Sequence, residues 1–325
     1  KNRISVAANP SMQPNSRWYT GAGIYRGVSI SHVCPLHIAP EGIFAYTKRL
    51  EGREAFVMVE VTVENHLDRD HQVRVQAVLE PEETADRAAD GASADETPEG
   101  AQQTESRKVI RDTVLLVKAG KKSVARIPMR VEDARLWDAE HPNLYRVRAS
   151  VQDMGIFTVC LEADQETEKA AESGDGFCDT AETLFGIRTV SADAAHGLLV
   201  NGTSVKLKGG CIHHDNGILG AVSLYDSEYR KLRLLKEAGF NAVRLAHNPP
   251  SKALLEACDR IGLYVFDEAF DAWGHSKQAG DYSQFFADHW KEDMEAFIVR
   301  DRNHPSILFW STGNEVEERG GVGDG

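Results

Sequence analysis

The sequence has little cysteine and no long apolar run, and it has fewer basic than acidic residues. Its five cysteines are odd in number, scattered over 325 residues, and never spaced as CxxC. Such a set favours reduced thiols over a disulfide framework, so we expect a cytoplasmic protein. No apolar run reaches membrane-spanning length, and the amino terminus has no signal-like apolar core. We therefore expect no membrane among its partners.

The excess of acidic residues also argues against nucleic acid as a partner. Lysine and arginine number 37 against 50 acidic residues, a net charge of -13, which argues against nucleic acid. With 42% hydrophobic and 27% charged residues, 325 residues predict a soluble globular protein of two or three domains. The charge is concentrated in Glu80 to Glu105, and we predict a disordered loop insertion near 81–103. A second acidic stretch, Glu162 to Asp179, is interpreted as a solvated loop.

The first 190 residues are typical of β structure, since short alternating or β-branched runs recur between turn residues. Trp137 and the following His141-Pro142-Asn143 predict a turn within this part. We expect an antiparallel sandwich. The predicted strands are Ile4–Ala7, Tyr25–Ser31, Phe56–Val63, Val73–Leu79, Val109–Val117, Ser123–Val131, Leu144–Val151 and Ile156–Leu161.

After about Thr189 the pattern changes to alternating strands and helices, which predicts a parallel sheet. Four strand–helix units make half of a (β/α)₈ barrel. The predicted strands are Val205–Cys211, Asn241–Leu245, Leu263–Asp267 and Ile307–Trp310, and the predicted helices are Ser227–Ala238, a second one opening at Ser251 and ending at Gly262, and a long third one around Trp290 to Ile298.

Functional side chains of such barrels lie just after each strand. Here every predicted strand is followed by groups that can hydrogen-bond a polyhydroxylated ligand. They are His213, His214 and Asp215; Arg244, His247 and Asn248; Asp267, Glu268, Asp271 and Trp273; and Asn314 with Glu315. An exposed carboxylic acid after the apolar run Ile307–Trp310 makes Glu315 the main catalytic candidate.

Each candidate also has a structural interpretation. Arg244 could be a buried ion-pair partner, and Trp273 could be ordinary core. Asp267 and Glu268 point in alternate directions, so one of them could line the barrel as a structural acid. Adjacent histidines such as His213 and His214 point to opposite faces of a strand, and no HxH or HExxH spacing occurs, so we predict no metal site.

Taken together, the strings resemble glycoside hydrolase family 2, the β-galactosidase and β-glucuronidase family. Their order and spacing span nearly the whole chain. They are Asn15–Arg26, Phe185–Arg188, Leu199–Gly202, Lys208–Asp215, Asn241–Arg244, His247–Pro250, Asp267–Glu268 and Gly313–Glu315.

The resemblance implies three domains: the end of a jelly-roll sugar-binding domain (1–36), an immunoglobulin-like sandwich (37–188) and the first half of a TIM barrel (189–325). It implies that Glu315 is the general acid/base and that Asn314 binds the sugar 2-hydroxyl. His213, Arg244 and His247 match positions that line the sugar pocket, and we add Asp267 and Trp273 as substrate-binding candidates. The string from His213 to Gly217 favours the β-galactosidase branch.

Two departures from the family pattern matter. The family's nucleophile is a second glutamate after the seventh barrel strand, whereas this chain stops after the fourth. Some members bind Mg²⁺ through a Glu-x-His pair after the third strand. Here that loop, Ala269 to His275, lacks the pair, so we expect no required cofactor; Mg²⁺ and Na⁺, which occur in the family, are not supported by this sequence.

The expected function of the parent protein is retaining hydrolysis of terminal β-galactosides, with Glu315 kept protonated by a neighbouring carboxylate and partial burial. The chain itself is expected to be a fragment, inactive alone and prone to self-association through unpaired sheet edges; for the parent we expect a homo-oligomer. Two alternatives stay open: a β-glucuronidase or β-mannosidase of the same family, and a non-catalytic carbohydrate-binding protein.

Overall fold

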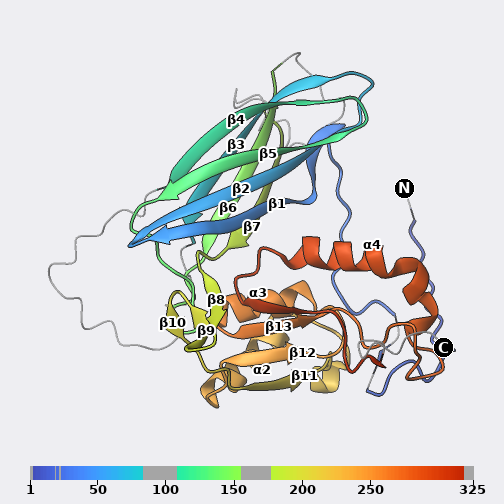
Figure 1. Ribbon diagram of the computed structural model, residues 1–325. Helices are drawn as coiled ribbons and strands as arrows, with labels where there is room; N and C mark the ends of the chain where they lie inside the picture. The colour runs from blue at the N-terminus through green and yellow to red at the C-terminus, as the bar shows by residue number, and fades with distance from the viewer. Residues whose placement is uncertain (1–2, 19, 22, 83–107, 155–176, 318–325) are drawn as a thin grey trace, which may run out of the picture. The chain divides into compact units, whose positions relative to one another are not determined.

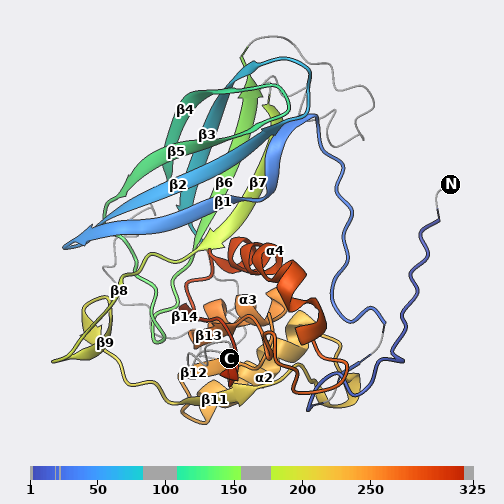
Figure 2. The same cartoon turned by 45° about the vertical axis from the view of Figure 1, so that its right-hand side comes forward.

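The computed structural model describes residues 3–18, 20–21, 23–82, 108–154 and 177–317, and Figures 1 and 2 show its elements from two directions. The chain forms two compact units. The sandwich unit comprises residues 32–136 and 143–189, and the barrel unit comprises residues 1–31, 137–142 and 190–325. Most of the predicted loop insertion, most of the second acidic stretch and the predicted strand Ile156–Leu161 lie outside the described residues.

The sandwich unit consists of two antiparallel sheets, as the alternating sequence predicted. One sheet has the strand order β1-β2-β5 and the other the order β4-β3-β6-β7. The first contains β1 (Leu36–Glu51), β2 (Glu54–Asn65) and β5 (Lys122–Val131); the second contains β3 (His71–Pro81), β4 (Val109–Val117), β6 (Tyr145–Asp153) and β7 (Phe177–Phe185).

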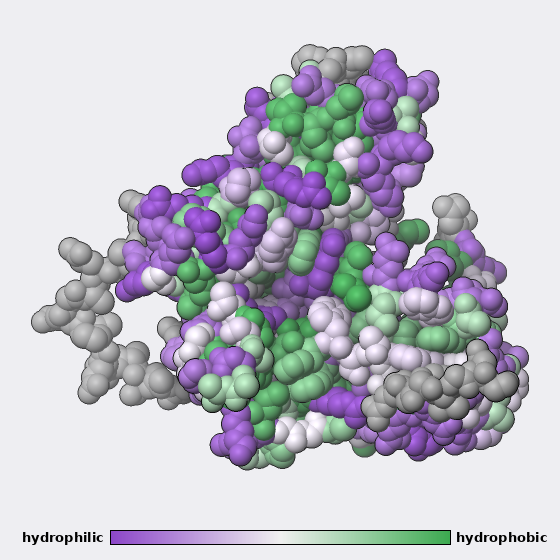
Figure 3. Space-filling view, in the orientation of Figure 1, coloured by the Kyte–Doolittle hydropathy of each residue, from purple (hydrophilic) through white to green (hydrophobic). Residues whose placement is uncertain are grey.

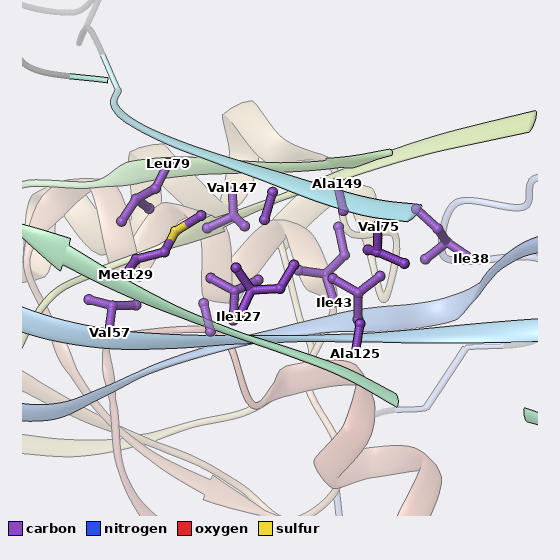
Figure 4. Close-up of a cluster of buried hydrophobic side chains, with 14 of the residues drawn as sticks. Ile38, Ile43, Val57, Val75, Leu79, Ala125, Ile127, Met129, Val147 and Ala149 are labelled. Atoms are coloured by element: carbon purple, nitrogen blue, oxygen red, sulfur yellow. The ribbon is translucent and has the colours of Figure 1, made fainter. Parts of the chain in front are cut away.

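Period-two alternation builds the sandwich core. Along β2, Val57, Val59 and Val61 are fully buried while the residues between them are half-buried. Aliphatic side chains from the two sheets meet in one contiguous cluster. Figure 4 shows Val57, Ala125, Ile127 and Met129 from the first sheet close to Val75, Leu79, Val147 and Ala149 from the second.

Strand β1 was not predicted, and Pro40 and Gly42 explain why, since both residues normally mark a turn. Here they form an irregularity inside one strand. The register shifts between Ile38 and Ile43, and Glu41 has a φ of 51°. A side chain at position 42 would meet the Ala39 carbonyl oxygen at 2.5 Å, so glycine allows the backbone to close up there.

Two other strand predictions are wrong. Ile4–Ala7 and Tyr25–Ser31 have strand-like composition, but the structure assigns no strand to either segment. Composition makes a segment suitable for a ladder, but a strand forms only where another strand pairs with it. Among the described residues, neither segment pairs with one.

The barrel unit contains a parallel sheet of order β11-β12-β13-β14, which is part of a (β/α)₈ barrel. Its apolar core lies where α2 and α3 meet the sheet, around Leu232, Leu254 and Val265. A small antiparallel sheet of β8, β9 and β10 precedes it. The bounds are β8 (Val190–Asp193), β9 (Gly197–Val200), β10 (Thr203–Ser204), β11 (Gly209–Ile212), η2 (Gly217–Leu219), α2 (Tyr225–Glu237), β12 (Ala242–Leu245), α3 (Lys252–Ile261), β13 (Tyr264–Glu268), α4 (Ser283–Asp301) and β14 (Ile307–Ser311).

Six residues, Trp137–Pro142, interrupt the sandwich sequence but belong to the barrel unit. The predicted turn is present and is joined by a bridge between Trp137 and Pro142. The Trp137 ring is fully buried, and its indole N–H donates to the Asp259 carbonyl at 2.9 Å. Lys236 Nζ donates to the Ala139 carbonyl at 2.6 Å. This strap, residues 137–142, is therefore fastened to helices α2 and α3.

Strands β11 and β14 form the edges of the described parallel sheet. On β14, Phe309 and Trp310 are exposed, and Figure 3 shows apolar residues at the surface of the barrel unit. A sheet edge with exposed aromatic side chains is suited to pairing with further structure. In the described part of the chain, none of the helices is both long and apolar enough to cross a membrane.

Candidate active site

Parallel register brings the ends of β12, β13 and β14 together, and Glu268, the last residue of β13, lies at their centre. Its side chain is fully buried. Arg244 donates to Oε2 through Nε at 3.1 Å and Nη2 at 2.6 Å. His247 Nδ1 lies 2.7 Å from Oε1, and Ser311 Oγ donates to Oε2 at 2.7 Å. A buried carboxylate requires this kind of compensation, because burying an unpaired charge is strongly unfavourable.

Asn314 is held at both ends of its amide. Its Oδ1 accepts from Arg244 Nη2 at 2.9 Å, and its Nδ2 donates to Asp271 Oδ1 at 2.8 Å. Its backbone N–H donates to the Phe270 carbonyl at 2.9 Å. Since one end accepts from a cation and the other donates to a carboxylate, only one orientation of the amide satisfies both partners. Asn314 therefore lies beside both Arg244 and Asp271.

Asp271 binds one cationic side chain from a distant part of the chain and one from its own loop. Besides Asn314, it accepts from Arg17 Nη2 at 3.2 Å and from Lys277 Nζ at 3.3 Å. Lys277 also donates to the backbone carbonyls of Asp271 and Asn314. One continuous polar network therefore runs from His247 through Glu268, Arg244 and Asn314 to Asp271 and its cations. We refer to it below as the Glu268–Asp271 network.

Glu315 follows this network directly but faces water. Its side chain is 71% exposed, with Arg17 Nη1 at 3.5 Å from Oε2. The sequence led us to expect a partly buried Glu315, but the described residues leave its side chain exposed. Its φ of 48° places a non-glycine residue in the left-handed region, where a side chain is disfavoured by about 1–2 kcal/mol. Such backbone conformations persist only where the surrounding structure enforces them, and they cluster at functional sites.

Three aromatic rings form a cluster beside the network. The Trp18 ring centroid lies 5.0 Å from that of His213 and 5.2 Å from that of His247, and the two histidines are 5.3 Å apart. Burial and the nearby His247 lower the pKa of His213, so a neutral imidazole is favoured at pH 7. His214 turns away toward Arg26, and burial lowers its pKa to about 4. The expected divergence of the adjacent histidines is confirmed.

The two remaining predicted substrate-binding residues, Trp273 and Asp267, are not among the polar contacts described above. Trp273 donates its indole N–H to the Thr312 carbonyl at 2.9 Å and stacks on Phe286. Asp267 is fully buried, and burial, followed by the nearby Asp301 carboxylate, raises its pKa to about 8. As placed, Asp267 has no contact with solvent from which to bind a ligand. Of the acidic pair after β13, Glu268 is the one joined to Arg244 and His247.

A cavity of about 640 Å³ lies against the network within the barrel unit. Glu315 instead borders a smaller recess of about 60 Å³ with Trp273 and Lys277. Among the residues described, the one group of three metal-ligand side chains lies in the sandwich, not beside this site. The walls of the larger cavity include Trp18, Tyr25, His247, Phe270, Asp271, Tyr282, Phe285 and Phe297.

Sequence reasoning missed Arg17, Trp18 and Lys277 as site residues, and it left Glu268 and Asp271 unassigned. Arg17 and Trp18 lie in a string already noted as family-like, Asn15 to Arg26. That string was the available signal. No local pattern reveals that a segment near residue 17 contacts residues 271 and 315, which are about 250 to 300 positions away.

Two family profiles match the chain. "Glycosyl hydrolases family 2" matches residues 36–161, and "Glycosyl hydrolases family 2, TIM barrel domain" matches residues 193–323. The chain belongs to glycoside hydrolase family 2. Both described units therefore carry family 2 domains, in the order that the sequence strings implied.

Relatives of this family 2 chain agree with the profiles. β-Galactosidase BoGH2A of Bacteroides ovatus is 35% identical over 318 residues, which are 98% of this chain and 32% of that protein. A Formosa agariphila protein, provisionally named a β-glucuronidase, is 32% identical over 97% of this chain and 26% of its own length. A solved family 2 structure from Bacteroides cellulosilyticus superimposes with a TM-score of 0.75 at 35% identity, covering 94% of this chain and 34% of that one. The chain thus spans about a third of the length of the relatives it matches.

Proposed function

We propose that the protein containing this family 2 chain is a retaining glycosidase that cleaves terminal β-galactosides. The observation that carries the proposal is the doubly held amide of Asn314, next to an exposed carboxyl on Glu315. An amide nitrogen has two hydrogens, so the bond to Asp271 leaves one for a sugar hydroxyl. A rigid donor of this kind favours the transition state, because it requires no reorganisation as charge develops.

In the proposed reaction, Glu315 protonates the leaving glycosidic oxygen and later removes a proton from the attacking water. A second carboxylate, about 5–5.5 Å away in retaining enzymes, attacks the anomeric carbon. On the family pattern it is a glutamate after a later barrel strand, so we assign no nucleophile within residues 1–325 and propose that this chain alone has no hydrolytic activity.

The pairing of the described cations at the site favours a neutral sugar. The described cations at the site are already paired: Arg244 with Glu268, and Arg17 and Lys277 with Asp271. A uronic acid would need an arginine or lysine that is free to bind its carboxylate. The absence of such a free cation among the described site residues supports a galactoside over a glucuronide. The rival proposal, a β-glucuronidase, is supported by the name of the Formosa agariphila relative.

The test is the hydrolysis rate of the full-length protein on aryl β-galactoside, β-glucuronide and β-mannoside, with and without Glu315→Gln. We expect selective β-galactoside turnover, reduced by roughly 10²- to 10⁴-fold in the variant, which is the usual contribution of a general acid/base. Glu317→Gln is the matched control, because Glu317 is an equally exposed carboxylate two residues away.

Each possible result decides one part of the proposal: the sugar, the role of Glu315 or the class of protein. Preference for the glucuronide or mannoside would overturn the proposed sugar but keep the acid/base. Equal rates for Glu315→Gln and Glu317→Gln would remove Glu315 from the mechanism. An absence of turnover on all three sugars, with binding retained, would favour a carbohydrate-binding protein instead.

A further inference from the structure

A group of metal-ligand side chains lies in the sandwich unit, on β1 and at the end of β2. His37 and Glu64 are direct cross-strand partners in the antiparallel ladder, and His66 follows Glu64 by two residues. Side chains two apart along a strand share a face, so all three can project to the same side. One potential ligand atom from each lies within 4.8 Å of the other two.

Two of these three side chains, those of His37 and Glu64, are buried. The His37 side chain is 8% exposed and that of Glu64 is 10% exposed, whereas that of His66 is 62% exposed. Within the described residues His37 Nδ1 has no hydrogen-bond partner, although it is buried. Nδ1 is not the nitrogen that faces Glu64; the other ring nitrogen, Nε2, is the one available to a ligand beside that carboxylate.

The spacing suits a shared metal ion. The Glu64 Oε2 atom lies 2.9 Å from His66 Nε2 and 4.0 Å from His37 Nε2. Two ligands at about 2.0–2.2 Å from a tetrahedral zinc ion lie about 3.4 Å from each other, between those two values. The imidazole centroids are 5.4 Å apart and the rings are parallel within 8°. Binding therefore requires the rings to turn toward the ion about χ2, a torsion with a broad energy well.

Lys122 keeps Glu64 in position for this role. Its Nζ lies 2.6 Å from Glu64 Oε1, and Lys122 pairs with Glu64 across the β2–β5 ladder. The ammonium group occupies one carboxylate oxygen and leaves Oε2 directed at the histidines. It also repels a bound cation at short range, so it lowers the affinity of the site.

We propose that His37, Glu64 and His66 bind a divalent transition-metal ion of the zinc class. Two imidazoles and one carboxylate are borderline donors that suit Zn²⁺ better than Mg²⁺ or Ca²⁺. The exposed side of His66 leaves room for water as a fourth ligand. The ion joins the start of β1 to the end of β2 and stabilises the sandwich at that edge.

The test uses the protein purified without a histidine tag, stripped with EDTA and titrated with ZnCl₂ against a chromophoric chelator. We expect one zinc ion per chain. His66→Gln, an exposed substitution that leaves the core intact, should weaken binding at least about tenfold, because even groups that only support a ligand contribute roughly 10- to 100-fold. Lys122→Gln should tighten binding.

His196→Gln is the matched control, since His196 is also an exposed histidine paired with one carboxylate, Asp193. It should bind zinc like the parent. Equal affinities of the parent and His66→Gln would overturn the proposal. So would loss of the bound zinc in His213→Gln or His247→Gln with retention in His66→Gln, because the ion would then belong to the barrel unit.

Discussion

The buried carboxyl of Asp267 makes the stability of the barrel unit depend on pH. The side chain is fully buried on β13, with the buried Asp301 carboxyl as its neighbour. Burial, and then the nearby buried Asp301, raises its pKa from 3.8 to about 8. At neutral pH the folded protein therefore holds a proton on Asp267 that the unfolded chain has released.

The sign and size of the effect follow from proton linkage. Between pH 3.8 and about 8 the folded state binds the extra proton, so the free energy of unfolding falls as pH rises. One pH unit corresponds to about 1.4 kcal/mol. At pH 7 this group accordingly lowers stability by up to about 4 kcal/mol relative to its contribution near pH 4. Asp267→Asn, which resembles the protonated acid, should remove that loss.

The measurement is urea unfolding of the parent and Asp267→Asn at several values from pH 5 to pH 8. All five tryptophans lie in the barrel unit, so their fluorescence reports its unfolding. The stability difference should grow in favour of the variant by up to about 1.4 kcal/mol per pH unit. Asp226→Asn, at an exposed position in the first turn of α2, is the control. Parallel pH profiles for the parent and Asp267→Asn would refute the reasoning.

Two further pairs of substitutions test the packing of the barrel unit. Glu268→Gln should lower the free energy of unfolding by about 3 kcal/mol, because it leaves Arg244 without its buried counterion, whereas Ser311→Ala should lose only about 1 kcal/mol for one hydrogen bond. Equal urea midpoints for these two variants would show that the ion pair contributes no more than a single hydrogen bond. Gly262→Ala should destabilise more than Gly197→Ala: both glycines have positive φ, but only at Gly262 would the new Cβ meet a backbone atom, the Ala139 carbonyl oxygen at 2.3 Å. Equal changes in melting temperature for the two glycine variants would mean that the strap residues 137–142 can move away from the new Cβ without a cost in stability.

Local elements of the barrel unit were predictable because each boundary has its own signal. Ser251 accepts a hydrogen bond from the Leu254 N–H at the start of α3, and Gly262 ends that helix with a φ of 80°, as the sequence indicated. Strand β1 was not predictable in the same way. Its Pro40 and Gly42 have the composition of a turn, and only pairing with β2 carries the strand through them.

Only some residues of the candidate site were predictable, and the contacts between them were not. The barrel pattern indicated that Arg244 and Asn314 each follow a strand, but not that they are joined by a hydrogen bond. The choice of Glu268 over Asp267 depends on which residue faces the ends of β12 and β14, and a one-residue difference in register reverses it. His37 and Glu64 are likewise far apart in sequence, and only the β1–β2 register places them side by side.

The strap residues 137–142 also limit how the sandwich and barrel units can be recombined with those of relatives, in evolution or in the laboratory. Because they interrupt the sandwich sequence, no single cut separates the two units. A barrel transplanted from residue 190 onward would lose Trp137, and with it the indole that packs on Tyr264 and caps the last turns of α3 at Asp259. Recombination between relatives should therefore succeed when residues 137–142 and the barrel come from the same parent.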